Sequence, residues 1–133
     1  MTFSPYIHFQ GQCAEAMTFY ADLFGANDLY MMRYSDVQDP AAPKSDRIMH
    51  GHMSVDGGAF MASDYPEGVK GDDQKGSSVY YNCKTVENGK RVYYALLDGG
   101  AAIHPFGPSF FSPGFGMVKD RFGTHWIVAT PET

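Results

Sequence analysis

The sequence contains one pattern twice, and this internal repeat restricts the possible folds more than any other feature. The segment FYADLFGAN (residues 19–27) matches YYALLDGGA (93–101): two aromatic residues, a short apolar helix end and then glycine. Gly25 and Gly99 stand where the end of a helix favours a left-handed residue. A repeat of this length predicts a fold built from two copies of one unit.

Each copy predicts one helix, over residues 13–24 in the first and 86–98 in the second. The apolar residues expected to be buried lie at helical spacing, namely Cys13, Met17, Tyr20 and Phe24 in the first helix and Val92, Tyr93, Leu96 and Leu97 in the second.

A second similarity follows each helix, where HMSVDGGAFMAS (52–63) parallels GMVKDRFGTHWIVAT (116–130). Both read as strand, Asp-led turn with glycine, and strand, which is typical of a hairpin. Each half therefore reads as strand, helix, strand, strand, strand. The expected strands are 4–10, 28–35, 47–55 and 58–64, then 77–84, 101–105, 114–119 and 124–129.

This order predicts an α+β fold in which duplicated βαβββ modules form curled mixed sheets around a concave cavity, with the helices outside. Module 1 would span residues 1–66 and module 2 residues 75–133, within a single domain of 133 residues. Aromatic residues make up 15% of the chain, enough to fill a core or line an apolar pocket.

Charge and composition argue against several classes of partner. The net charge is −5 and no run of Lys or Arg is present, so we expect neither a nucleic acid nor an anionic membrane as partner. No apolar run reaches the roughly 18 residues needed to span a bilayer, and residues 1–11 do not resemble a signal peptide. Cys13 and Cys83 are isolated, which favours free thiols and a cytoplasmic protein.

Three segments carry a resemblance to a known family: PYIHFQGQCAEAMTFYADLFGA (5–26), IMHGHMSVDGGAFMASD (48–64) and PGFGMVKDRFGTHWIV (113–128). With the duplicated βαβββ order, they resemble the vicinal oxygen chelate superfamily, which includes glyoxalase I, bleomycin-binding proteins and extradiol dioxygenases. Within it the chain is most similar to the PhnB-like group. The resemblance implies a homodimer and, in catalytic members, a divalent metal held by the first and fourth strands of each module.

The metal positions that this resemblance implies carry no usual ligand here. Counting back from Phe19 places the first at Pro5, and the others fall at Met61 or Ala62, near Tyr80, and at Ile127. Pro, Ala, Met and Ile offer no carboxylate or imidazole, and a lone Tyr is an unusual anchor for a divalent metal. We therefore expect no metal cofactor, and an apolar cavity lined by Met61, Tyr80 and Ile127.

Two histidines leave an alternative open. His50 and His52 lie two apart on a predicted strand, so they point to the same face and could hold a shifted divalent metal with His8, Asp64 or His104. His50 is also the candidate catalytic residue, as an acid or base without metal. Strand parity with Pro5 predicts that His8 points away from the cavity, and parity with Ile127 places His125 on the side of Ile127.

The loop FGPSFFSPGFG (106–116) is the remaining candidate. Its aromatic residues Phe110, Phe111 and Phe115 could close the open edge of the sheet, or they could cover a bound ligand. Two simpler assignments accompany it. Asp120 is expected to cap its own turn, and Cys13 to be a buried helix residue rather than a reactive thiol.

The sequence favours a protein that binds a small organic molecule in an apolar aromatic cavity, without the usual metal ligands. The alternative is a metal-dependent lyase, isomerase or dioxygenase of the same superfamily, with a shifted site around His50 and His52.

Overall fold

The computed structural model describes residues 3–39, 41 and 44–131, and within them it has two α-helices, eight strands and one 3-10 helix. These elements are β1 (Tyr6–Phe9), α1 (Cys13–Phe24), β2 (Tyr30–Arg33), η1 (Tyr34–Asp36), β3 (Ile48–Val55), β4 (Gly58–Asp64), β5 (Val79–Asn82), α2 (Val86–Leu97), β6 (Ala101–Gly107), β7 (Phe115–Lys119) and β8 (His125–Ala129). The order confirms the α+β class and the duplicated βαβββ arrangement.

The chain divides into two compact units, residues 1–73 and 74–133, and each contains one four-stranded sheet. The strand order is β1-β4-β3-β2 in unit 1 and β5-β8-β7-β6 in unit 2. In both sheets the first strand pairs in parallel with the last, and the other pairs are antiparallel. The two sheets therefore have the same topology, as duplication of one unit predicts.

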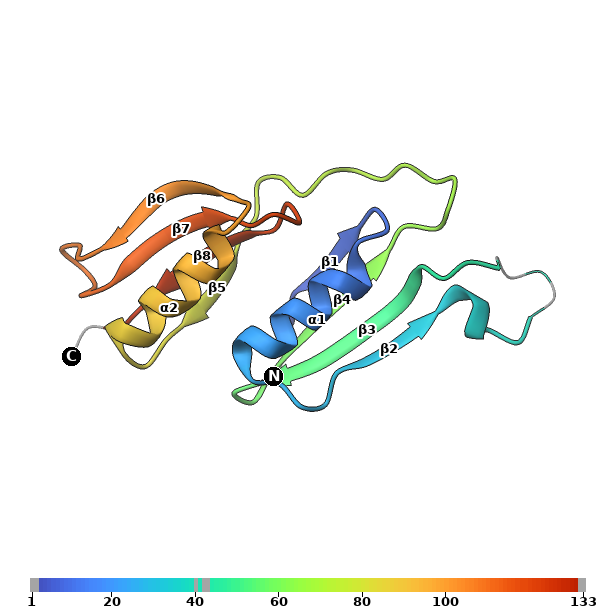
Figure 1. Cartoon of the computed structure of the whole chain (residues 1–133), viewed down its shortest axis with the longest axis horizontal. Coiled ribbons are helices and arrows are strands. Elements are labelled where there is room, and N and C mark those ends of the chain that lie inside the picture. The colour runs from blue at the N-terminus through green and yellow to red at the C-terminus, as the bar shows by residue number, and fades with distance from the viewer. Residues whose placement is uncertain (1–2, 40, 42–43, 132–133) are drawn as a thin grey trace. The chain divides into compact units, whose positions relative to one another are not determined.

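One helix packs on one face of each sheet (Figure 1), α1 on β3 and β4 and α2 on β6, β7 and β8. The helix residues that face the sheet are almost completely buried: Cys13, Ala16, Met17 and Tyr20 in α1, and Val92, Tyr93 and Leu96 in α2. Burying one such large side chain contributes roughly 1.5–3 kcal/mol, so these contacts dominate the stability of each unit. Phe24 is only half-buried, contrary to the sequence prediction.

Helix boundaries follow from local sequence. Gly25 ends α1 with φ 73°, the left-handed conformation that the repeat predicts. Thr85 caps α2, because its side chain accepts a hydrogen bond of 3.0 Å from the backbone N–H of Asn88. The residue at position 89, inside α2, is a glycine because a Cβ there would come within 2.6 Å of the Cys83 sulfur.

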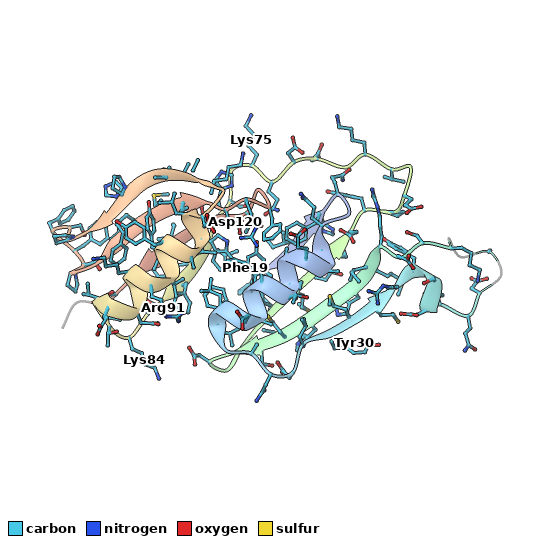
Figure 2. The ribbon with its side chains drawn as sticks, viewed as in Figure 1. Phe19, Tyr30, Lys75, Lys84, Arg91 and Asp120 are labelled. Atoms are coloured by element: carbon cyan, nitrogen blue, oxygen red, sulfur yellow. The ribbon has the colours of Figure 1, made fainter. Side chains whose placement is uncertain are left out.

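The hairpins are built as predicted. Asp56 and Gly57 both have positive φ, 48° and 80°, which matches the primed turns that suit the twist of a two-residue hairpin. Asp120 accepts backbone hydrogen bonds from Phe122 (2.9 Å) and Thr124 (3.0 Å), so it caps its own turn. Its other oxygen accepts from the Trp126 indole at 2.9 Å, which ties the turn to β8. Figure 2 shows Asp120 at this turn.

A buried carboxylate holds unit 1 together at the end of β4. Asp64 is 2% exposed and accepts three backbone hydrogen bonds, from Gly11 (2.8 Å), Cys13 (3.0 Å) and Ile48 (2.8 Å). These donors belong to the start of α1, the loop before it and the first residue of β3. One side chain therefore connects segments that are far apart in the sequence, and its full set of partners explains why a carboxylate is tolerated there.

Cys13, at the start of α1, is not an activated thiol. The thiol is completely buried, and burial together with the neighbouring negative charge of Asp64 raises the pKa of Cys13 to about 12. The expectation of a buried helix cysteine is confirmed. Neither described cysteine takes part in a disulfide. Both α-helices of the described chain are too short to cross a lipid bilayer.

Replacing Asp64 with Asn should lower the free energy of unfolding by about 2–4 kcal/mol. An amide NH₂ in place of one oxygen cannot accept from a backbone N–H, and it leaves a buried donor unsatisfied. Urea unfolding followed by circular dichroism measures the loss. Asp28→Asn is the matched control, because Asp28 also accepts a backbone hydrogen bond (from Ser54, 2.9 Å) but is exposed, and its loss should be small. Equal losses in the two variants would contradict this role of Asp64.

The Cys13 thiol should also make stability depend on alkaline pH. Its pKa is raised from an unfolded value near 8.5 to about 12, so the stabilisation is complete below about pH 8.5 and decreases as the pH rises above it. Urea midpoints measured from pH 7 to 10 should fall more steeply in the wild type than in Cys13→Ala. Parallel curves would show that the thiol does not cause the dependence.

Candidate functional site

Strand alternation gives each sheet a second face that its own helix does not cover. In unit 1 this face, here called face 1, carries Tyr6, His8, Tyr30, Met32, His50, His52, Met61 and Ser63. In unit 2 the corresponding face 2 carries Tyr80, Asn82, His104, Phe115, Met117, Lys119, His125, Ile127 and Ala129. Because residues i and i+2 of a strand share a face, the pairing registers fix both sets.

Face 1 is polar and aromatic. The Tyr6 hydroxyl forms a hydrogen bond of 3.0 Å with Nδ1 of His50, and the two rings stack with centroids 5.7 Å apart. His8 lies on the other side of Tyr6, at 5.2 Å between centroids, and stacks at 5.3 Å on Tyr65, which follows β4. Nδ1 of His8 is 3.3 Å from the Ser63 hydroxyl. Four rings thus form a continuous row over the sheet.

The predicted orientation of His8 is wrong. Tyr6 pairs with Met61 and His8 with Ser63, so Tyr6 and His8 lie on the side of Met61, while Pro5 does not share their parity. The count back from Phe19 runs through the bend at residues 10–12, where Gly11 has φ 100°. Strand parity is not preserved through a bend, and the residue of β1 beside Met61 is Tyr6.

The histidine pair is arranged as the spacing predicts. His52 pairs with Tyr30 on β2 and with Met61 on β4, and His50 pairs with Met32, so both imidazoles lie on face 1. Figure 2 shows Tyr30 on β2, the outer strand of this sheet. The Asp28 carboxylate interacts with His52, and its pKa is lowered, chiefly by the backbone hydrogen bond from Ser54 and to a lesser degree by His52.

Asp64 does not join the histidine pair. It lies two residues after Ala62, which pairs with Gly51, and its three backbone partners occupy the carboxylate. Among the described residues, no group of three or more His, Cys, Asp or Glu side chains is arranged to hold a metal ion. The implied metal positions carry Tyr6, Met61, Tyr80 and Ile127, whose phenol, thioether and alkyl groups do not fit a divalent metal.

Face 2 carries an apolar row as well as the polar residues Asn82, His104, Lys119 and His125. Tyr80 pairs with Ile127 and Ile127 with Met117, so these predicted contact residues form a row across β5, β8 and β7. A chain of edge-to-face rings adjoins the row. The centroid distances are 5.5 Å from His104 to Phe115, 4.8 Å from Phe115 to Phe111, and 5.0 Å from Phe111 to Phe110.

Several of these apolar side chains are exposed in the described structure. Phe110 is 97% exposed, Tyr80 56% and Phe111 42%, whereas Phe115 and Ile127 are half-buried. His125 lies on the same side as Ile127, as predicted, and its Nδ1 is buried without a hydrogen-bond partner among the described residues. The loop after β6 therefore presents its first two phenylalanines outward instead of closing the sheet edge with them.

The match of the sequence to known proteins shows which family this chain belongs to. Residues 1–129 match the family model described as 3-demethylubiquinone-9 3-methyltransferase. The chain belongs to this family. This family corresponds to the PhnB-like group of the vicinal oxygen chelate superfamily, so the resemblance seen in the sequence is confirmed.

Solved structures agree with this membership. Protein PA1353 from Pseudomonas aeruginosa is 34% identical, with a TM-score of 0.91, and the match covers 100% of this chain and 99% of that one. A putative 3-demethylubiquinone-9 3-methyltransferase, PhnB protein, from Bacillus cereus is 28% identical, with a TM-score of 0.79 and coverage of 98% and 99%. A glyoxylase/bleomycin resistance protein/dioxygenase domain from Frankia sp. EAN1pec shares only the fold, at 11% identity, a TM-score of 0.66 and coverage of 99% and 98%.

Sequence reasoning missed the central residue of face 1. The sequence prediction places Pro5 at the metal position of the first strand, so it includes neither Tyr6 nor Ser63. The signal that could have found both is the pairing of the first strand with the fourth, since Tyr6 and His8 must share a face with Met61 and Ser63 once that pairing is set.

Removing the Tyr6 hydroxyl should leave the PhnB-like protein folded. Tyr6 is 38% exposed, so we expect Tyr6→Phe to lower the free energy of unfolding by at most about 1 kcal/mol. The matched comparison is Tyr93→Phe, because the Tyr93 hydroxyl donates within the core towards the carbonyl oxygens of His104 (3.0 Å) and Met117 (3.2 Å). Losing that buried donor should cost about 1–3 kcal/mol. Urea unfolding of both variants tests the order, and a larger loss in Tyr6→Phe would contradict it.

Proposed function

We propose that this protein binds a small organic molecule through apolar and aromatic contacts, without a resident metal or other cofactor. The contacts assigned to it in unit 2 are Tyr80, Phe110, Phe111, Phe115 and Ile127. Met61, the remaining residue predicted to contact a ligand, lies on face 1 of unit 1 and is assigned to that unit alone. The single observation that supports the proposal best is the chain of rings that runs from the exposed Phe110 and Phe111 to the half-buried Phe115.

Hydrophobic burial explains why these residues favour a ligand. Burying apolar surface stabilises by roughly 25 cal/mol of free energy per Å², and an exposed phenylalanine ring has a large area that a ligand could bury. Exposed aromatic residues that lie together on a surface are typical of binding sites, whereas single exposed apolar residues are common on any protein surface. A flat apolar molecule that covers Phe111 would recover that free energy and add edge-to-face contacts with the neighbouring rings.

The alternative, a metal-dependent lyase, isomerase or dioxygenase around His50 and His52, has less support. Two imidazoles on one strand supply two ligands, and no third His, Cys, Asp or Glu side chain of the described residues joins them. Methyl transfer, the activity in the family's description, is a further alternative, and the binding test below distinguishes it from the proposal.

We also infer that the protein works as a homodimer in the cytoplasm. The resemblance to the superfamily supports the dimer, and the isolated cysteines support a reducing compartment. Light scattering coupled to size-exclusion chromatography tests the first inference, and a mass corresponding to one chain of 14.7 kDa would contradict it.

Toluene is a suitable probe for the apolar contacts, because it has a ring and no polar group. We expect it to bind the wild type in an NMR titration, and Phe111→Ser to weaken the binding about threefold to tenfold, since an aromatic pair is worth about 0.5–1.5 kcal/mol beyond its area. Val69→Ser is the control, because Val69 is 50% exposed but lies outside the proposed contacts.

Two results would contradict the proposal. Toluene binding that Phe111→Ser and Val69→Ser weaken equally would show that the exposed rings are not the site. Tight binding of S-adenosylmethionine, with transfer of its methyl group to a quinol, would instead support the activity in the family's description.

A further inference from the structure

The two units of the chain carry very different charges. Residues 1–73 contain eleven Asp and Glu but four Lys and Arg, whereas residues 74–133 contain four Asp and Glu and six Lys and Arg. An anionic small molecule is therefore repelled by unit 1 and attracted by unit 2. Since salt screens exposed charges over about 10 Å, cations that lie close to a binding site contribute most to its affinity.

One cation of unit 2 lies beside the proposed apolar contacts. Lys119 on β7 belongs to face 2 and is two residues from Met117, so it stands about 7 Å along the strand from the row of Tyr80, Ile127 and Met117. Its side chain is exposed and forms no ion pair with the residues that the structure describes. The ammonium group is therefore available to an anion that lies next to the row.

No carboxylate of the described part of unit 2 shares face 2 with Lys119. Glu87 lies in the first turn of α2 and Asp98 follows its last residue, so both belong to the helix. Asp120 is 3% exposed and accepts from two backbone N–H groups and from the Trp126 indole, on the other side of the sheet. An anionic ligand would thus meet no like charge on this face.

A second donor stands directly opposite the lysine. Lys119 pairs with His125, and such a pair has Cβ atoms about 4.5–5.5 Å apart on one face. Nδ1 of His125 is buried without a partner, whereas Nε2, at the far edge of the ring, makes no hydrogen bond and reaches solvent. Because a buried N–H without an acceptor is rarer and costlier than a bare lone pair, the proton of the neutral imidazole belongs on Nε2. His125 then offers an N–H beside the ammonium.

The duplication shows that the sheet does not need this pair. With Met61 equivalent to Ile127, the pair Lys119–His125 corresponds to Ser54–Ala59 in unit 1, which forms the same sheet. A buried ring nitrogen without a partner also lowers stability. The two polar side chains therefore need another explanation than the stability of the fold.

From these observations we propose that the ligand of unit 2 is an aromatic carboxylate, and that its carboxylate group binds Lys119 and His125. The inference rests on the proposed function, because the aromatic ring would lie on Met117 and Ile127. A carboxylate has one charge and two acceptor oxygens, which match one ammonium and one neutral N–H donor. A phosphate monoester would bring up to two negative charges to a single cation.

Three probes that share a ring and differ in charge test the site: benzoate, toluene and benzylammonium. In NMR titrations of the full chain, benzoate should bind more tightly than toluene, and benzylammonium more weakly. Added NaCl should weaken benzoate and not toluene. Lys119→Met keeps most of the side-chain length and should weaken benzoate about twofold to fivefold, the range for an exposed ion pair, without weakening toluene.

Two further variants serve as controls. Lys90→Met removes the same charge from an exposed position of α2, on the other side of the sheet, and should leave benzoate binding unchanged. His125→Phe keeps a ring and removes the unpaired nitrogen, so it should weaken benzoate about twofold without lowering the urea midpoint of unfolding.

The inference is overturned if benzoate binds no more tightly than toluene, or if Lys90→Met weakens it as much as Lys119→Met does. A lower urea midpoint in His125→Phe would show that the imidazole stabilises the fold, and would contradict its assignment to the site. Failure of toluene to bind would contradict the proposed function, whereas toluene binding without a preference for benzoate would overturn this inference alone.

Discussion

A four-stranded sheet has two faces, and each unit of this chain has a single α-helix with which to cover them. The contacts of Tyr20 and Met17 in unit 1, and of Tyr93 and Leu96 in unit 2, fix which face becomes the core. Everything on the other face is then set by strand alternation. The candidate residues on the strands are there because the helix packs on the opposite face of the sheet, whereas Phe110 and Phe111 lie in the loop after β6.

The two units show how one topology tolerates different local chemistry. Unit 1 is closed at the end of β4 by the carboxylate of Asp64, which binds three backbone N–H groups. At the equivalent end of β8, Thr130 lies 3.2 Å from the Cys83 sulfur, which also donates to the carbonyl of Ala129. The same junction is satisfied once by an ion and once by neutral groups, in keeping with the rule that buried polar atoms find partners. Divergence of this kind also distinguishes the hydrogen-bonded Tyr6 and His50 of face 1 from the apolar row of Tyr80, Ile127 and Met117 on face 2.

Most of the fold could be predicted from the sequence because its signals are local. The helix over Cys13–Phe24 has the predicted bounds, and the turn at Asp56 has the positive φ values that its Asp-Gly sequence favours. β6 extends to Gly107, two residues beyond the prediction. The strand can continue past Pro105 because β6 is an outer strand, and a proline interrupts no hydrogen bonds on the side that has no neighbouring strand.

The candidate site was less predictable because it depends on register. His50 and His52 share a face by spacing alone, which is a local property, and the structure agrees. Whether Pro5 or Tyr6 stands beside Met61 depends on how the chain bends at Gly11, and no periodicity reports that bend. For the same reason the partner of His50, a residue on another strand, could not be found by reading along the sequence.

We infer that the positions used for metal in the superfamily serve organic ligands in this PhnB-like protein. The most direct test is the metal content of untagged protein, purified without chelator and dialysed, followed by titration with Mn²⁺, Ni²⁺, Zn²⁺ and Fe²⁺. We expect no stoichiometric metal and no saturable binding at micromolar concentration. One equivalent of metal per chain that survives dialysis, and that disappears in His50→Ala, would contradict it and establish the metal-dependent alternative.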